Sequence, residues 1–309
     1  MADDFLTAAD LLIVNDQNAD SNLDISDVLD DAPLMSRLPA VEATGGNIHK
    51  FIKQVEAPLV GFRDINDGRD HDSSVDEAVT INLAILDASF SVDVAVADAY
   101  RGGTRALLEK EAKRHLRAAF RKADDTIVSG TSADFVGLTG AFSSWSTPAT
   151  VMLSNKAAGA GGSDLTSVYS LKLGDNGCAV VLGAGGLEIG ESQIQRVSGS
   201  SSGHYMAWVT PIYCWIGLQV GSINTVGRIC NISSGDDTTL TDAMVFEHLT
   251  KWQQSDPSIL VMNRRSREQL RSSRTATNAT GAFADMPTES AGIEIVVSES
   301  VLSNETDQA

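Results

Sequence analysis

A long, basic and amphipathic segment, residues 104–130, places the strongest limit on what this chain can fold into. Apolar side chains recur along it at helical spacing, at Leu108, Ala112, Leu116, Phe120, Ala123 and Ile127. Gly102 and Gly103 precede the segment, Gly130 ends it, and no proline interrupts it. The spacing predicts a helix over residues 105–128 of roughly 36 Å, far longer than the average helix of about 11–12 residues.

The charge of this segment is opposite to that of the whole chain. Between residues 101 and 122 there are eight Lys or Arg residues and two Glu residues, which gives +6, whereas the chain carries −18. The predicted helix should therefore be basic along one side and apolar along the other. Either the basic side has a binding role, or it is the ordinary solvated face of a core helix.

Length and composition exclude several classes of protein. A chain of 309 residues can bury one large core or two ordinary ones. The net charge argues against a nucleic-acid binder that is basic all over, but it leaves a local basic face possible. The three cysteines, Cys178, Cys214 and Cys230, lack metal-site spacing and are expected to be free thiols. We find neither a signal peptide nor an apolar run long enough to span a membrane, and expect a protein made in a reducing cytoplasm.

The first 31 residues carry nine aspartates and no Lys or Arg, which predicts an arm rather than part of a core. Within the arm, residues 16–27 have the ligand spacing of an EF-hand or dockerin calcium loop. The calcium candidates are Asp16, Asn18, Asp20, Asp24 and Asp27. Ser21 stands where such a loop normally needs glycine for its sharp turn. The hypotheses are therefore a calcium-dependent binding module and a plain acidic arm.

Residues 48–93 have the alternation of β-structure. Apolar residues alternate from Val79 to Ile85 and then, in the opposite phase, from Ala88 to Val94, which predicts one long strand with a bulge near Leu86. Residues 49–62 are also expected to be extended, and residues 67–74 form a polar turn between the two. The predicted object is one long hairpin. Because a lone two-stranded ribbon is marginal in water, we expect it to rest on another copy of the chain.

Charged residues cluster at the tip of this hairpin. They are Arg63, Asp67, Arg69, Asp70 and Asp72. Two hypotheses fit them: a solvated turn, or ion pairs with a neighbouring subunit that are individually weak and sensitive to salt.

The rest of the chain predicts short strands and two helices. The strands are expected at 168–171, 179–182, 205–209, 216–220, 227–232, 259–262 and 293–298, and the helices at 241–252 and 265–274. Residues 199–203 match the pattern G-x-S-x-G around Ser201, which would suggest a hydrolase. That motif needs a strand before it, a helix after it and a base, and none is predicted here, so we do not expect an enzyme.

Several short sequence segments, in their order along the chain, indicate a family resemblance. They are residues 30–34 (DDAPL), 57–63 (APLVGFR), 83–90 (LAILDASF), 127–131 (IVSGT), 217–220 (GLQV), 226–232 (VGRICNI), 261–265 (VMNRR) and the closing stretch 293–306. With them the chain resembles the major capsid proteins of tailed bacteriophages, which have the Hong Kong 97 type fold. The resemblance implies an α+β fold with an N-terminal arm (1–47), an extended loop (48–93), a peripheral domain with the spine helix (94–235), an axial domain (236–295) and a C-terminal segment (296–309).

The resemblance also implies a function and partners. Subunits of that family form hexamers and pentamers that close into an icosahedral shell around double-stranded DNA, and the spine helix lies on the inner side. It therefore implies that seven basic residues face DNA: Arg105, Lys110, Lys113, Arg114, Arg117, Arg121 and Lys122. The protein is expected in the virion after synthesis in the host cytoplasm, without a membrane. Separate scaffolding, portal and cementing proteins are further expected partners, and calcium is the single cofactor considered.

Overall fold

The computed structural model describes residues 31–56, 58–70, 72–141, 151–154, 164–199, 203–221, 225–234, 238–252, 256–278 and 282–305. The chain divides into two compact units, each built from separate segments. Unit 1 comprises residues 1–48, 82–140 and 180–218, and unit 2 comprises residues 49–81, 141–179 and 219–309. The domain boundaries expected from the sequence stay a prediction.

Unit 1 is organised around α5 (Thr104–Ser129), which confirms the helix that the apolar spacing predicts. At about 1.5 Å per residue its 26 residues form a rod of roughly 39 Å. Gly103 precedes the helix with a φ of 84°, a conformation that glycine adopts without steric cost. The side chains of Leu116, Phe120 and Ile127 are fully buried, so this part of the predicted stripe is the core face. At its start, Leu107 is buried in place of the predicted Leu108, which is half-buried.

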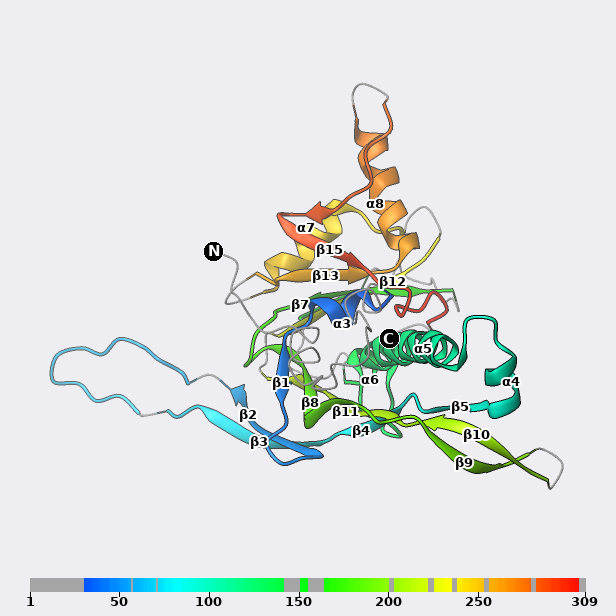
Figure 1. Cartoon of the computed structure of the whole chain (residues 1–309). Helices are drawn as coiled ribbons and strands as arrows, with labels where there is room; N and C mark the ends of the chain where they lie inside the picture. The colour runs from blue at the N-terminus through cyan, green and yellow to red at the C-terminus, as the bar shows by residue number, and fades with distance from the viewer. Residues whose placement is uncertain are drawn as a thin grey trace. The chain divides into compact units, whose positions relative to one another are not determined.

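The N-terminal side of unit 1 packs against this helix. The short helix α3 (Pro33–Arg37) begins with proline and lies alongside α5 (Figure 1). Leu34, Met35 and Leu38 are fully buried there. The backbone N–H of Met35 also donates to Oδ1 of Asp124 on α5 over 2.9 Å. Because Asp124 is buried, this hydrogen bond satisfies a carboxylate that would otherwise be costly inside the core.

Two sheets complete unit 1. A four-stranded sheet has the order β1 (Ala40–Glu42), β8 (Cys178–Ile189), β11 (Ile212–Val220) and β4 (Ala84–Asp87). A three-stranded sheet has the order β5 (Phe90–Asp93), β10 (His204–Thr210) and β9 (Gln193–Ser198). β1 runs parallel to β8, whereas β4 is antiparallel to β11. Two short helices, α4 (Val94–Ala99) and α6 (Leu138–Ala141), flank α5 in the sequence.

The single long strand predicted over residues 79–94 is wrong. It is divided into β3 (Val75–Asn82), β4 and β5, which belong to three different sheets. The change of phase marks the break between β4 and β5, where the Ser89 hydroxyl accepts a hydrogen bond from the Ile212 N–H over 3.1 Å. Val94 starts a helix, because the Asp93 carboxylate caps the N–H of Ala95 at 2.9 Å.

The expected hairpin is present as a two-stranded sheet of β2 (Ile48–Glu56) and β3. Figure 1 draws it as a narrow ribbon, in blue and cyan, that continues into a long loop. All described side chains from residue 58 to 74 are exposed, so this loop has no cover within the described part of the chain.

Unit 2 contains a six-stranded mixed sheet. Its order is β14 (Glu289–Ser290), β15 (Ile293–Val297), β13 (Ile259–Met262), β7 (Thr166–Leu171), β12 (Val226–Ile232) and β6 (Val151–Ser154). β13 runs parallel to β15 and antiparallel to β7. Every residue of β7, β12 and β13 is buried, as expected for strands that are covered on both faces.

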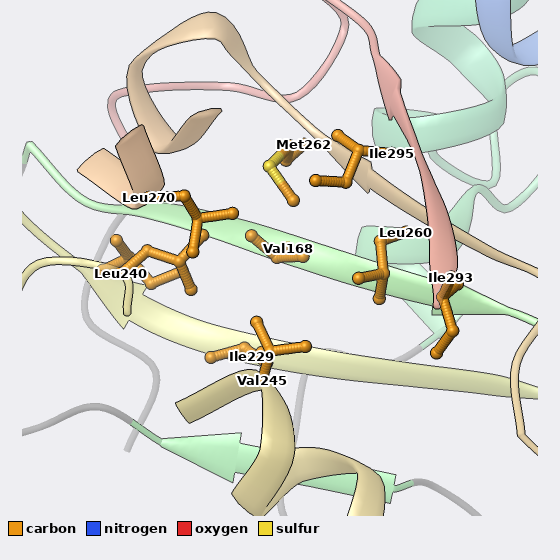
Figure 2. Packing of buried hydrophobic residues seen from close by; sticks show 10 residues of the cluster. Val168, Ile229, Leu240, Val245, Leu260, Met262, Leu270, Ile293 and Ile295 are labelled. Carbon is orange, nitrogen blue, oxygen red and sulfur yellow. The ribbon is translucent and has the colours of Figure 1, made fainter. Parts of the chain in front are cut away.

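Helices α7 (Asp242–Thr250) and α8 (Arg264–Thr277) contribute side chains to the core of this sheet. Figure 2 shows Val245 of α7 near Ile229 of β12, and Leu270 of α8 near Leu240. Both helices start at a side-chain cap, Thr241 for α7 and Asn263 for α8. The strands and helices predicted after residue 165 are thereby confirmed. Among the described residues, no helix has the length and apolar character needed to cross a membrane.

Candidate interaction surfaces

The basic residues predicted to face DNA form one main stripe on α5. At about 100° per residue, five of the seven fall within roughly 100° of one another around the helix. This basic stripe consists of Lys110, Lys113, Arg114, Arg117 and Arg121. Arg105 and Lys122 lie outside it, because they point toward other sides of the helix. Four members of the stripe are exposed and Lys113 is half-buried, so the stripe is a continuous cationic strip at the surface of unit 1.

Two acidic residues of α5 partly neutralise the predicted cations. Nη1 of Arg114 lies 2.7 Å from Oε1 of Glu111, and Nε of Arg105 lies 3.1 Å from Oε1 of Glu109. The ammonium of Lys110 lies 5.9 Å from the centre of the Tyr100 ring, at the limit of a cation–π contact. Such exposed pairs hold side chains loosely, so they leave the cations free to exchange partners.

Asp31 makes contacts with α5 that the sequence did not predict. Its Oδ1 lies 3.1 Å from Nη2 of Arg121, and its Oδ2 lies 3.5 Å from Nε of Arg117. The last aspartate of the acidic arm is therefore bound to the basic stripe. The opposite charges of the arm and of residues 101–122 were the signal in the sequence that could have suggested this contact.

Charged residues at the tip of the ribbon shape its loop. The guanidinium of Arg69 donates to the carbonyl oxygens of Leu59 at 2.7 Å and Gly61 at 3.0 Å. Oδ2 of Asp72 accepts from the N–H of Leu59 at 2.8 Å. These side chains thus connect the two sides of the loop, a role that neither sequence hypothesis included.

Arg63, Asp67 and Asp70, the other predicted contact residues at this tip, are also exposed. Nη1 of Arg63 donates to the carbonyl oxygen of Asp67 over 3.2 Å, which adds a local link. Whether they bind a neighbouring subunit stays a prediction.

Apolar side chains on the same loop were missed by the sequence reasoning. We call Leu59, Val60, Phe62 and Ile65 the apolar tip; their exposed fractions are 76%, 87%, 107% and 93%. Apolar residues that gather on a surface mark an interaction site more often than single ones do. The signal in the sequence was the number of large apolar residues among the charged residues of this loop.

Arginines of α8 form a second basic row, and this one is used inside unit 2. The guanidinium groups of Arg267, Arg271 and Arg274 donate to the carbonyl oxygens of Pro287, Ala284 and Glu289, each over 2.9 Å. Arg274 also makes a bidentate pair with Asp242, at 2.7 and 2.8 Å. These hydrogen bonds hold the segment that follows α8 against the helix. The arginines of this row therefore already have partners within unit 2.

The described residues contain nothing that resembles an active site. Oγ of Ser170 lies 2.7 Å from Nε2 of His248, but both residues are fully buried and no substrate could reach them. Burial lowers the pKa of His248 to about 4 and raises the pKa values of Cys178 and Cys214 to about 12. Buried thiols of this kind are inert.

The remaining candidates fall on parts of the chain that are not described. Ser201 and the calcium candidates Asp16, Asn18, Asp20, Asp24 and Asp27 all lie outside the described residues. Elsewhere, in the described ranges, no group of three or more His, Cys, Asp or Glu residues could hold a metal ion. Nothing observed here supports the calcium-binding alternative.

Comparisons with known proteins agree with the capsid resemblance. A chain of the bacteriophage epsilon15 structure superposes with a TM-score of 0.61 at 19% identity, covering 89% of this chain and 88% of that one. The bacteriophage JBD30 capsid gives a TM-score of 0.51 at 10% identity, covering 85% and 88%. These similarities show the α+β, Hong Kong 97 type fold. No curated protein matches the chain significantly.

A sequence family model covers nearly the whole chain. The model described as Major capsid protein GP7 matches residues 16–308, which includes nearly all of both units and about half of the acidic arm. This family is one of structural capsid proteins and not of enzymes. The chain therefore belongs to the major capsid protein GP7 family and is a subunit of a bacteriophage capsid.

Proposed function

We propose that this subunit assembles into hexamers and pentamers of an icosahedral shell, and that the apolar tip of its ribbon docks on a neighbouring copy. The observation that carries the proposal is the exposure of Leu59, Val60, Phe62 and Ile65 at the end of a two-stranded ribbon. Burying a side chain of this size is favourable by about 1.5–3 kcal/mol. A contact repeated around a ring adds this gain at every subunit, which supports closed assembly.

We further propose that the basic stripe of α5 faces the packaged double-stranded DNA. Its five cations can bind phosphates and release counterions without reading sequence. The predicted domain division, the arm (1–47), extended loop (48–93), peripheral domain (94–235) and axial domain (236–295), belongs to the same proposal. So do synthesis in the host cytoplasm and separate scaffolding, portal and cementing proteins.

Assembly can be tested at the apolar tip. Phe62→Asp is expected to leave a folded subunit that forms no shells in negative-stain electron microscopy, because it puts a charge into the contact. Phe62→Leu, which keeps the site apolar, is the matched control and is expected to assemble. Deleting residues 66–75 is also expected to preserve the fold and impair assembly. Normal shells from both Phe62→Asp and the deletion would contradict the proposed role of the ribbon.

DNA contact can be tested with unassembled subunits, whose inner face is accessible. Replacing Lys110, Lys113 and Arg114 by Gln should reduce the slope of log K against log salt by roughly 0.9 per lost phosphate contact. The control replaces Arg105 and Lys122, which lie outside the stripe. Equal slopes for the two variants would contradict a role for this stripe.

A further inference from the structure

The arm and α5 run in the same direction along their contact. Met35 is hydrogen-bonded to Asp124, whereas Asp31, four residues earlier, is bound to Arg121 and Arg117. From Met35 back to Asp31, the chain therefore moves toward the N-terminal end of the helix. The rest of the basic stripe lies beyond Arg117 in that direction.

The remaining stripe lies within reach of the next aspartates. From Arg117 to Lys110 is seven residues of helix, or about 10 Å. Extended chain covers that distance in roughly three residues. Asp30 and Asp27 stand one and four positions before Asp31, and residues 1–30 carry eight aspartates with no Lys or Arg. The arm is therefore long enough to reach the rest of the basic stripe, and its negative charge is complementary to the stripe.

We propose that the acidic arm, residues 1–31, binds the basic stripe of α5 in place of DNA and must be displaced before phosphates can bind there. The Asp31 carboxylate already lies against Arg117 and Arg121, where phosphate oxygens would bind, so the subunit carries its own competitor. Because the arm is tethered, its effective concentration at the stripe is high. It would limit premature binding of nucleic acid to subunits that have not assembled. The arm contact stands by itself, while the competition with DNA rests on the proposed function.

The arm contact can be tested without DNA. A carbodiimide joins a carboxylate directly to a lysine amine only when the two touch, and mass spectrometry identifies the pair. On the full chain we expect arm aspartates to couple to Lys110 and Lys113. Lys122 is exposed but lies about 100° around the helix from Arg121, so it is the internal control. Absence of arm coupling to the stripe, or equal coupling to Lys122, would overturn the inference.

Competition is tested by adding short double-stranded DNA to the same reaction and by measuring its affinity for unassembled subunits. DNA should suppress the coupling, and Asp31→Asn should bind DNA about two- to fivefold more tightly than the control Asp134→Asn. Asp134 is exposed and follows α5, so the control removes the same charge elsewhere. In a chain that also carries Arg117→Gln and Arg121→Gln, Asp31→Asn should have no effect.

The possible outcomes separate the two claims. If the arm couples to the stripe but no variant binds DNA, the proposed DNA contact fails and the arm contact stands. If DNA binds equally to Asp31→Asn and Asp134→Asn, the competition is refuted even though the stripe binds DNA.

Discussion

Nη2 of Arg228 lies 2.9 Å from Oε2 of Glu305 inside unit 2, where only 1% and 5% of the two side chains are exposed. Nε of Arg228 also donates to Oγ of Ser167 over 3.0 Å, and the Ser167 hydroxyl donates to Glu305. The backbones of Leu165 and Glu305 form a β-bridge next to this cluster. A fully buried arginine in β12 is thus neutralised by a residue near the end of the chain.

Glu305→Gln should therefore destabilise the protein strongly. Removing one partner of a buried ion pair leaves an uncompensated charge, at a cost of about 3–5 kcal/mol in the free energy of unfolding. Urea denaturation measures this change. The control is Glu299→Gln, which breaks an exposed pair with Arg264 and should have little effect. Similar decreases in the free energy of unfolding for the two variants would show that the buried pair stabilises the fold no more than the exposed one.

Acid should weaken the fold through His248. Burial lowers the pKa of this histidine to about 4, whereas the unfolded chain has its ordinary value of 6.5. Between these values the unfolded state binds the extra proton, so stability falls as the pH drops from about 6.5 to 4, by roughly 3 kcal/mol in total.

Denaturation at a series of pH values checks this dependence. His248→Gln should flatten the profile in that window, whereas His204→Gln, on an exposed strand position, should leave the slope unchanged. An unchanged slope for His248→Gln would exclude His248 as its source.

Gly130 is required where α5 ends. A Cβ at this position would lie 2.4 Å from the carbonyl oxygens of both Phe135 and Thr126, closer than atoms can approach. Gly130→Ala should lower the free energy of unfolding by about 1–3 kcal/mol because the backbone must shift. Gly68→Ala, with open space around the new methyl group, is the control. Thermal denaturation that ranks the two variants equally would argue against this close approach.

Loss of the hydrogen bonds that Arg69 makes across the loop should affect assembly more than folding. Arg69→Ala frees the carbonyls of Leu59 and Gly61, so the apolar tip loses its ordered shape before it docks. We expect the protein concentration needed for assembly, measured by light scattering, to rise about tenfold, since lost pre-organisation weakens each contact. Arg69→Lys keeps the charge but not the forked geometry, and should also be impaired. Normal assembly of Arg69→Lys would show that charge alone matters.

The sequence predicted the elements that follow a regular period. The stripe through Leu116 and Phe120 predicts α5, and Gly130 predicts its end, because both depend on local chemistry. Residues 79–94 were predicted as one strand because the alternation continues across the break at Leu83, although β3 and β4 join different sheets. The change of phase near Leu86 was interpreted as a bulge, whereas it marks the end of β4. Partners distant in sequence, such as Asp31 with Arg121, could not be derived from spacing. Their charges suggested an attraction but no geometry.

The most direct test of the account is an electron cryo-microscopy reconstruction of particles formed by the intact chain. It should show a closed shell in which the apolar tip at Phe62 lies on a neighbouring subunit and the basic stripe of α5 faces the interior. A protein that remains a monomer at high concentration, or a shell with α5 on the outer surface and the ribbon free of neighbours, would contradict it.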